Sequence, residues 1–126
     1  MIKWFEKNNK ISWMITMLIA IAIFYISTLT FGPSSRITGN KSIIYHIGIF
    51  FLFSLFLLIS SVKGGRKSLI PIAVIIAIFY GVLDEFHQYY IPGRFFSIFD
   101  MMINTLGILI ASVIYLISIY KRQHTF

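Results

Sequence analysis

The chain has 126 residues, of which 58% are hydrophobic and only 12% are charged, a composition that excludes an ordinary water-soluble domain and is typical of an integral membrane protein. Its net charge of +7 comes from basic residues grouped beside apolar runs, a pattern that favours orientation in a bilayer and argues against nucleic-acid binding. Cysteine is absent, which excludes disulfides, thiolate nucleophiles and cysteine zinc sites.

Four long apolar runs predict four transmembrane helices in one domain that spans residues 1–126. The helices are expected over residues 11–31, 43–62, 69–89 and 99–120. A basic segment precedes the first run, as in a signal peptide, but this run is longer than the apolar part of a signal peptide and no Ala-x-Ala cleavage site follows it. The sequence therefore predicts an all-α integral membrane protein that retains its first helix.

Lysine and arginine are distributed unevenly between the two predicted sides of the membrane. The side with both termini and the 63–68 loop carries eight of them beside the spans, whereas the other side carries Arg36, Lys41 and Arg94. The positive-inside rule then predicts cytoplasmic termini in a multi-pass protein of a bacterial cell membrane. The polar residues of the opposite side would gather at the extracytoplasmic face.

Polar chemistry is concentrated between residues 81 and 107, a stretch that holds three of the four acidic residues. The apolar segment from Leu69 to Val82 forms only about 21 Å of helix, whereas a hydrocarbon core is about 30 Å thick. The third helix must therefore continue through Asp84 and Glu85. Ionisable groups at that depth are costly and need a partner or a function. The Ile-Pro-Gly-Arg sequence that follows predicts a turn before the fourth helix.

Helical spacing places several of these polar residues on common faces. Asp84 and Gln88 are four positions apart on the third helix. Asp100, Asn104 and Gly107 form a stripe along the fourth helix. The small residue on this stripe predicts close helix packing, and Asn104 is expected to make an interhelical hydrogen bond.

The carboxylates allow three interpretations. They could act as acid and base catalysts, they could hold Mg²⁺ or Ca²⁺ through oxygen ligands, or they could form a structural ion-pair network. In the network, three carboxylates would balance three cations: Asp84, Glu85 and Asp100 with Arg36, Lys41 and Arg94. Arg94 is also suited to a phosphate, which guanidinium binds in bidentate fashion. His46, one turn into the second helix, is expected to make a structural hydrogen bond.

The run DEFHQYYIPGRFFSIFDMMINTLG resembles the signature of the VanZ-like family, which combines Asp-Glu-x-x-Gln with Pro-Gly-Arg and then with an Asp, an Asn and a Gly. The matching positions are Asp84, Glu85, Gln88, Pro92, Gly93, Arg94, Asp100, Asn104 and Gly107. Lys41 and His46 are similar to a Lys-His pair at the start of the family's second helix. The resemblance implies a small cell-envelope protein of a Gram-positive bacterium, of the kind associated with low-level resistance to the glycopeptide teicoplanin.

The first functional hypothesis is a protein whose outer-face polar site binds a lipid-linked or cell-wall ligand, or the glycopeptide, and so lowers glycopeptide sensitivity. The residues expected to bind are Lys41, His46, Asp84, Glu85, Gln88, Arg94, Asp100 and Asn104. The second is a membrane hydrolase or transferase that acts on a lipid phosphate headgroup, with Asp84, Glu85 and Asp100 as candidate catalytic residues. The third, a proton or ion pathway, is less favoured because the cytoplasmic halves of the spans lack charged residues.

The expected cofactors and partners follow from these hypotheses. No cofactor is expected other than a divalent cation held by Asp84, Glu85 and Asp100. Membrane lipids are the expected partners, together with a lipid-linked cell-wall precursor or a glycopeptide, and nucleic acid is not. The small interior of four helices is compatible with a homodimer, and the sequence leaves open whether the protein is an enzyme.

Overall fold

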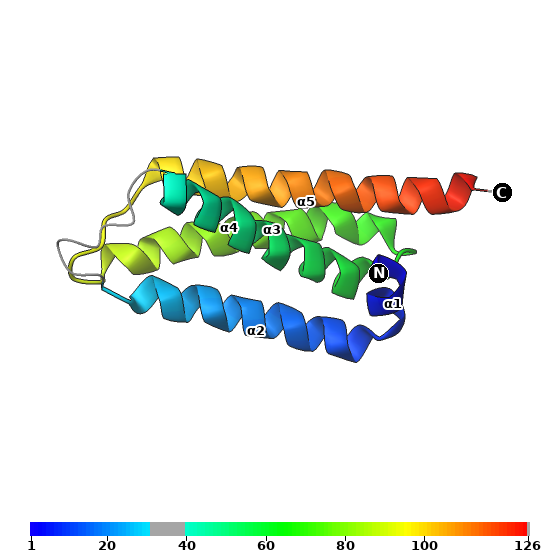
Figure 1. Ribbon diagram of the computed structural model, residues 1–126, viewed down its shortest axis with the longest axis horizontal. Coiled ribbons are helices and arrows are strands. Elements are labelled where there is room, and N and C mark those ends of the chain that lie inside the picture. The colour runs from blue at the N-terminus through cyan, green and yellow to red at the C-terminus, as the bar shows by residue number, and fades with distance from the viewer. Residues whose placement is uncertain (31–39, 126) are drawn as a thin grey trace.

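The computed structural model describes residues 1–30 and 40–125, and every regular element in these two ranges is helical. The elements in chain order are α1 (Ile2–Lys7), α2 (Asn9–Thr28), α3 (Asn40–Val62), the 3-10 turn η1 (Lys67–Leu69), α4 (Ile70–Tyr89) and α5 (Ile98–His124) (Figure 1). The helices α2, α3, α4 with η1, and α5 are each long and apolar enough to cross a membrane. The prediction of an all-α protein with four transmembrane helices is confirmed at this level.

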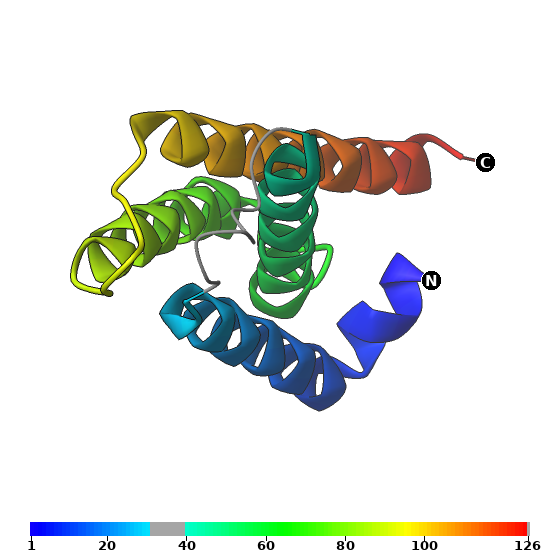
Figure 2. The same ribbon diagram turned by 60° about the vertical axis from the view of Figure 1, so that its left-hand side comes forward.

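The four long helices lie side by side, and both chain termini lie at one end of the bundle (Figure 1). We call this the terminal end, and we call the opposite end, where α4 stops and α5 begins, the distal end. Helix α3 lies in the middle and contacts α2, α4 and α5, most extensively α5 (Figure 2). It accordingly supplies much of the core, including Phe50, Leu58 and Ile59.

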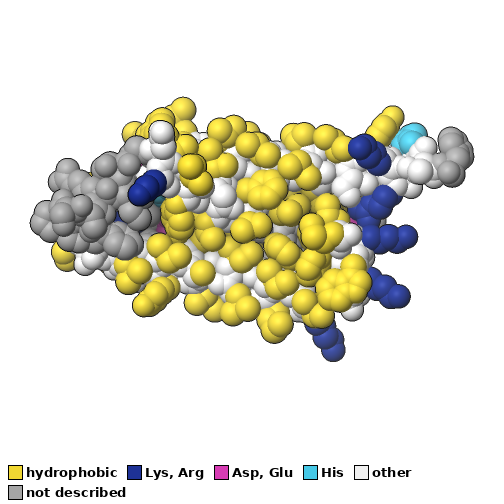
Figure 3. Space-filling view, viewed as in Figure 1, with side chains coloured by type: hydrophobic (Ala, Val, Ile, Leu, Met, Phe, Trp, Pro, Cys, Tyr) yellow, Lys and Arg dark blue, Asp and Glu magenta, His cyan; other side chains and the backbone are white. Residues whose placement is uncertain are grey.

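Large apolar side chains cover the outside of the bundle along its length (Figure 3). Ile75 and Phe79 on α4, and Leu109 and Val113 on α5, are among the exposed ones. A surface of this kind suits lipid tails, since a soluble monomer rarely exposes so much continuous apolar area. Lysine and arginine side chains gather at the terminal end (Figure 3).

Helices α3 and α5 pack with their backbones in close approach. A Cβ atom placed on Gly107 of α5 would lie 2.5 Å from the carbonyl oxygen of Ile47 on α3, so only glycine fits there. Ala111, one turn further on, is fully buried. Close approach through small residues is a common way to join helices in a membrane, and the predicted packing stripe is confirmed.

A hydrogen-bonded network closes the terminal end. Glu6 of α1 accepts a hydrogen bond from the Tyr115 hydroxyl at 2.7 Å and forms an ion pair with Arg122 at 2.5 Å, both on α5. The Tyr115 hydroxyl also accepts the backbone N–H of Gly64 at 3.0 Å. Gly64 has a φ of +69°, and a side chain there would press against the Glu6 carboxylate. The network therefore joins α1, the α3–α4 connection and α5.

Some element bounds differ from those expected. Helix α1 was not predicted, and α5 continues to His124 rather than ending at residue 120. The extension is favourable because basic side chains suit the last turn of a helix and Arg122 is paired with Glu6. Helix α2 ends at Thr28 rather than 31, since Leu29 has an extended backbone. Helix α3 begins at Asn40 rather than 43.

Candidate functional site

The site lies at the distal end of the bundle. Two hydrogen bonds of Ser97 hold the backbone there between α4 and α5. The Ser97 side chain caps α5 by accepting a hydrogen bond from the backbone N–H of Asp100 at 3.1 Å. The backbone N–H of Ser97 donates to Glu85 Oε2, also at 3.1 Å. Glu85 thereby ties the end of α4 to the start of α5, so that the two helices carry their polar residues to the same place.

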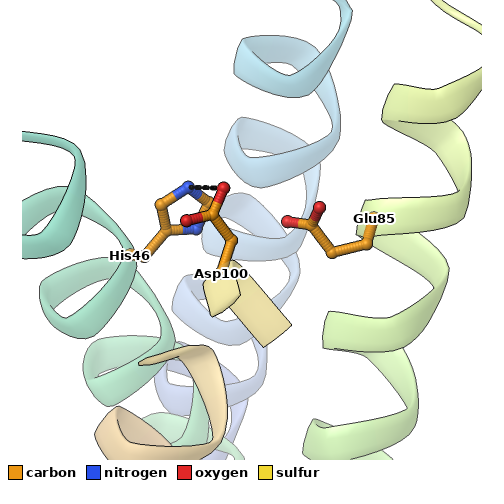
Figure 4. Close-up of side chains that lie close together, drawn as sticks. All are labelled: His46, Glu85 and Asp100. Atoms are coloured by element: carbon orange, nitrogen blue, oxygen red, sulfur yellow. Dashed lines mark ion pairs between the residues drawn. The ribbon is translucent and has the colours of Figure 1, made fainter. Parts of the chain in front are cut away.

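His46 of α3 lies opposite two polar residues of α5. Its Nδ1 is 2.8 Å from Asn104 Oδ1, and its Nε2 is 3.6 Å from Asp100 Oδ2 (Figure 4). Because the amide oxygen is an acceptor, Nδ1 carries the proton and donates it. The predicted interhelical hydrogen bond of Asn104 is confirmed, and so is the predicted hydrogen bond of His46.

The Glu85 carboxylate completes a group of three. Its side chain points toward His46 and Asp100 (Figure 4), and one ligand atom from each of the three residues lies within 4.8 Å of the others. Glu85 is fully buried, and its Oε1 has no hydrogen-bond partner within residues 1–30 and 40–125. Asp100 keeps 22% of its side chain exposed, which leaves the group open on one side.

Asp84 and Gln88 form a separate buried pair on α4. Gln88 Nε2 donates to Asp84 Oδ2 at 3.1 Å, as their spacing of four residues predicts. Asp84 is also buried but is not part of the three-residue group, because neighbouring residues on a helix point about 100° apart and Asp84 and Glu85 therefore face different partners. The structure therefore groups His46, Glu85 and Asp100, rather than the three carboxylates Asp84, Glu85 and Asp100 that were expected as possible cation ligands.

The basic residues of the site do not contact these carboxylates within the part of the chain that the structure describes. Arg94 Nη1 donates to the backbone carbonyl of Leu29 at 3.3 Å, and Lys41 is exposed at the start of α3. Arg36 lies outside the described residues. Among the described residues, the ion pair at the distal end joins His46 and Asp100. The expected network, in which arginine and lysine side chains pair with three carboxylates, is not seen among these residues.

Ser97 is a site residue that the sequence reasoning missed. The sequence Ser97-Ile98-Phe99-Asp100 matches the pattern Ser-x-x-Asp that starts many helices, so a signal for the cap was present. His87 on α4 stacks on Phe24 of α2 with ring centroids 4.4 Å apart.

An apolar groove of about 440 Å³ lies between α4 and α5. It is lined by Ile78, Val82, Ile98, Met101, Met102, Thr105, Leu106 and Leu109. Val82 precedes Glu85 by less than one helical turn, and Met101 follows Asp100 directly. The groove therefore begins at the same level of the bundle as the polar group.

These features define a multi-pass membrane protein with a buried polar site at one end of a four-helix bundle. A family model described as VanZ/LLP1 matches residues 3–119. The chain therefore belongs to the VanZ/LLP1 family, and the resemblance of its Asp84 to Gly107 motif to this family is confirmed. No curated protein and no solved structure matched the chain.

Proposed function

We propose that this protein is a cell-envelope factor that binds a lipid-linked cell-wall ligand at its distal end and thereby lowers sensitivity to glycopeptides. One observation carries the proposal. Within the described residues, Glu85 Oε1 and Asn104 Nδ2 are buried without hydrogen-bond partners. A buried polar atom without a partner costs about 1–3 kcal/mol, so a site that keeps two of them is suited to a ligand that satisfies them.

The orientation of the bundle supports an extracytoplasmic site. The lysine and arginine side chains gather at the terminal end, and the positive-inside rule assigns that end to the cytoplasm (Figure 3). The distal end with Glu85 and Asp100 then lies in the outer leaflet. Lipid-linked cell-wall precursors and glycopeptides act on that side of the membrane. In a Gram-positive cell, no outer membrane separates that side from the medium.

Arg94 supplies the positive charge that a lipid phosphate would need. Its guanidinium has five N–H donors, of which the described residues use one, on the Leu29 carbonyl. It is close enough for its charge to act on both Asp84 and Glu85. A phosphate bound by Arg94 would receive hydrogen bonds from its remaining N–H donors.

The groove between α4 and α5 supports a ligand with a hydrocarbon chain. Its α5 residues, from Ile98 to Leu109, span about 16 Å along the helix axis. An isoprenoid or acyl chain in this groove would place its polar head at the level of Glu85 and Asp100. An apolar groove that begins beside a polar group favours a lipid-linked ligand over a free sugar or peptide.

The proposal is tested in a susceptible Gram-positive host by the inhibitory concentrations of teicoplanin and vancomycin. Cells carry empty vector, wild type, the double variant Glu85→Gln with Arg94→Ala, or the control Lys121→Ala at the terminal end, at matched membrane abundance. Selective protection against teicoplanin by wild type and the control, lost in the double variant, is expected. Equal teicoplanin sensitivity with wild type and with empty vector would refute the role in resistance.

Ligand binding is measured separately with purified protein in phosphatidylcholine nanodiscs that contain undecaprenyl phosphate. Wild type and Lys121→Ala should retain this lipid in a pull-down, and Arg94→Ala should retain less. Equal retention by all three proteins would argue against a phosphate site at Arg94, whatever the resistance assay shows.

A second candidate function is hydrolysis or transfer at a lipid phosphate headgroup. The observation that favours it is the approach of His46, Glu85 and Asp100 to within 4.8 Å, which could position an activated water. Products that depend on the protein and disappear in Glu85→Gln would support an enzyme. Identical lipid profiles with and without the protein would exclude this activity on those lipids.

A further inference from the structure

In the neutral form of His46, its contact with Asp100 places two lone pairs face to face. His46 Nδ1 donates its proton to Asn104 Oδ1, so the neutral ring carries a lone pair on Nε2. That atom faces the carboxylate oxygen Asp100 Oδ2 at 3.6 Å. Two acceptors at this distance repel each other unless a proton or a cation lies between them.

Glu85 adds a third donor atom to the same space. Its Oε1 is buried, lacks a hydrogen-bond partner within the described residues, and belongs to a side chain aimed at His46 and Asp100 (Figure 4). When both carboxylates are ionised, one proton on the imidazole balances only one of their two negative charges. A divalent cation would balance both carboxylates while leaving the ring neutral.

The distances suit a metal ion bound by nitrogen and oxygen. Three donors bound to one ion at about 2.1 Å lie about 3.4 Å apart in a tetrahedral arrangement, so atoms that now lie within 4.8 Å of one another would move closer by up to about 1.4 Å. Imidazole suits zinc and other transition metals, whereas Mg²⁺ and Ca²⁺ prefer oxygen ligands alone. The Asn104 amide holds the non-ligating ring nitrogen, and Ser97 holds the second oxygen of Glu85, as outer partners of metal sites commonly do.

From this geometry we propose that His46, Glu85 and Asp100 form a binding site for a divalent transition-metal ion such as Zn²⁺. The partial exposure of Asp100 leaves a further coordination position open toward the distal surface, where water or an anionic ligand can bind. The proposal does not depend on the function proposed above, because it concerns an ion bound by the purified protein alone.

The test uses the full chain without a polyhistidine tag, purified in detergent and freed of metal with a chelator. Zinc is titrated against a chromophoric competing chelator for wild type, Asp100→Asn, Glu85→Gln and the control Lys121→Ala at the terminal end. One zinc ion per chain is expected, with affinity lowered at least about tenfold by Asp100→Asn and Glu85→Gln, because loss of an outer partner alone lowers metal affinity by about that factor, and unchanged by Lys121→Ala. Lack of zinc binding by wild type, or equal affinity in all four proteins, would overturn the proposal.

A second measurement does not depend on the folding of these variants. The chain has three histidines, so the variant with His87→Gln and His124→Gln keeps His46 alone. In the ¹⁵N-histidine NMR spectrum of this variant, zinc should shift the Nε2 resonance of His46 strongly and leave Nδ1 protonated. A shift at Nδ1, or no shift with saturating zinc, would contradict the proposed coordination.

Discussion

Glu85 accepts the hydrogen bond from the Ser97 backbone amide that the acidic residue three positions into a capping box, here Asp100, would ordinarily accept. The two carboxylates therefore have different roles at the start of α5. Glu85 completes the cap from a different helix, and Asp100 is free to face His46 across the bundle. A helix cap and the candidate site can in this way share a small set of residues.

Replacing the cap should weaken the start of α5. Ser97→Ala removes the acceptor of the Asp100 N–H, and loss of such a cap costs about 1 kcal/mol. We expect a lower unfolding midpoint in a chemical denaturation series in detergent. The control Ser61→Ala removes a hydroxyl that bonds only to the Leu57 carbonyl of its own helix, so its effect should be smaller. A larger loss in the control would contradict the capping role.

The close approach of α3 and α5 predicts that Gly107→Ala is poorly tolerated. Its Cβ would lie 2.5 Å from the backbone oxygen of Ile47, and overpacking of this kind costs about 1–3 kcal/mol. The control is Gly48→Ala on α3, where a Cβ meets no atom within 4 Å and where alanine is the better helix former. Thermal unfolding should separate the two variants, and equal stability would show that α5 can move away at little cost.

Tyr115→Phe should loosen the terminal end without affecting the distal site. The change removes a hydroxyl that donates to Glu6 and accepts from Gly64, and the loss of these two part-buried hydrogen bonds costs about 1–3 kcal/mol in total. Hydrogen exchange should rise at Gly64 and in α1, whereas zinc affinity should stay unchanged. The exposed Tyr120→Phe serves as the control. A fall in zinc affinity in Tyr115→Phe would show that the two ends are coupled.

Filling the groove should separate recognition of the hydrocarbon chain from recognition of the headgroup. Val82→Trp places an indole between α4 and α5 and should reduce retention of undecaprenyl phosphate in nanodiscs. Zinc binding, which needs no hydrocarbon chain, should be unchanged. Val113→Trp, on a lipid-exposed position of α5 that does not line the groove, is the matched control. Equal retention by both variants would remove the groove from the proposed function.

Much of the architecture could be predicted because it depends on local properties of the chain. Apolar runs set the four long helices, and the spacing of Asp84 and Gln88 gave their hydrogen bond. Partners on different helices were harder to assign. His46 and Asn104 are 58 positions apart, and nothing local indicates that the start of α3 lies beside the start of α5.

The periodicity of the sequence also did not predict where the helices end, because helix ends depend on partners that are distant in the sequence. Helix α5 runs on through Arg122 because Glu6, near the other end of the chain, meets it. Asp84 and Glu85 are both buried, and which of them joins His46 and Asp100 depends on how α4 is rotated about its axis. A sequence shows that two adjacent acids are present but not which one faces that group.

The burial of Glu6 has a consequence for the way the terminal end meets a membrane surface. It is the one acidic residue outside the stretch from Asp84 to Asp100, and its side chain is only 7% exposed because Tyr115 and Arg122 enclose it. Anionic lipid headgroups at that end therefore meet lysine and arginine side chains with almost no repulsion from carboxylates. Each lysine or arginine near such a surface contributes about 1 kcal/mol of attraction. We expect this attraction to favour one depth of the bundle in the membrane, with the distal residues at the level of the opposite leaflet.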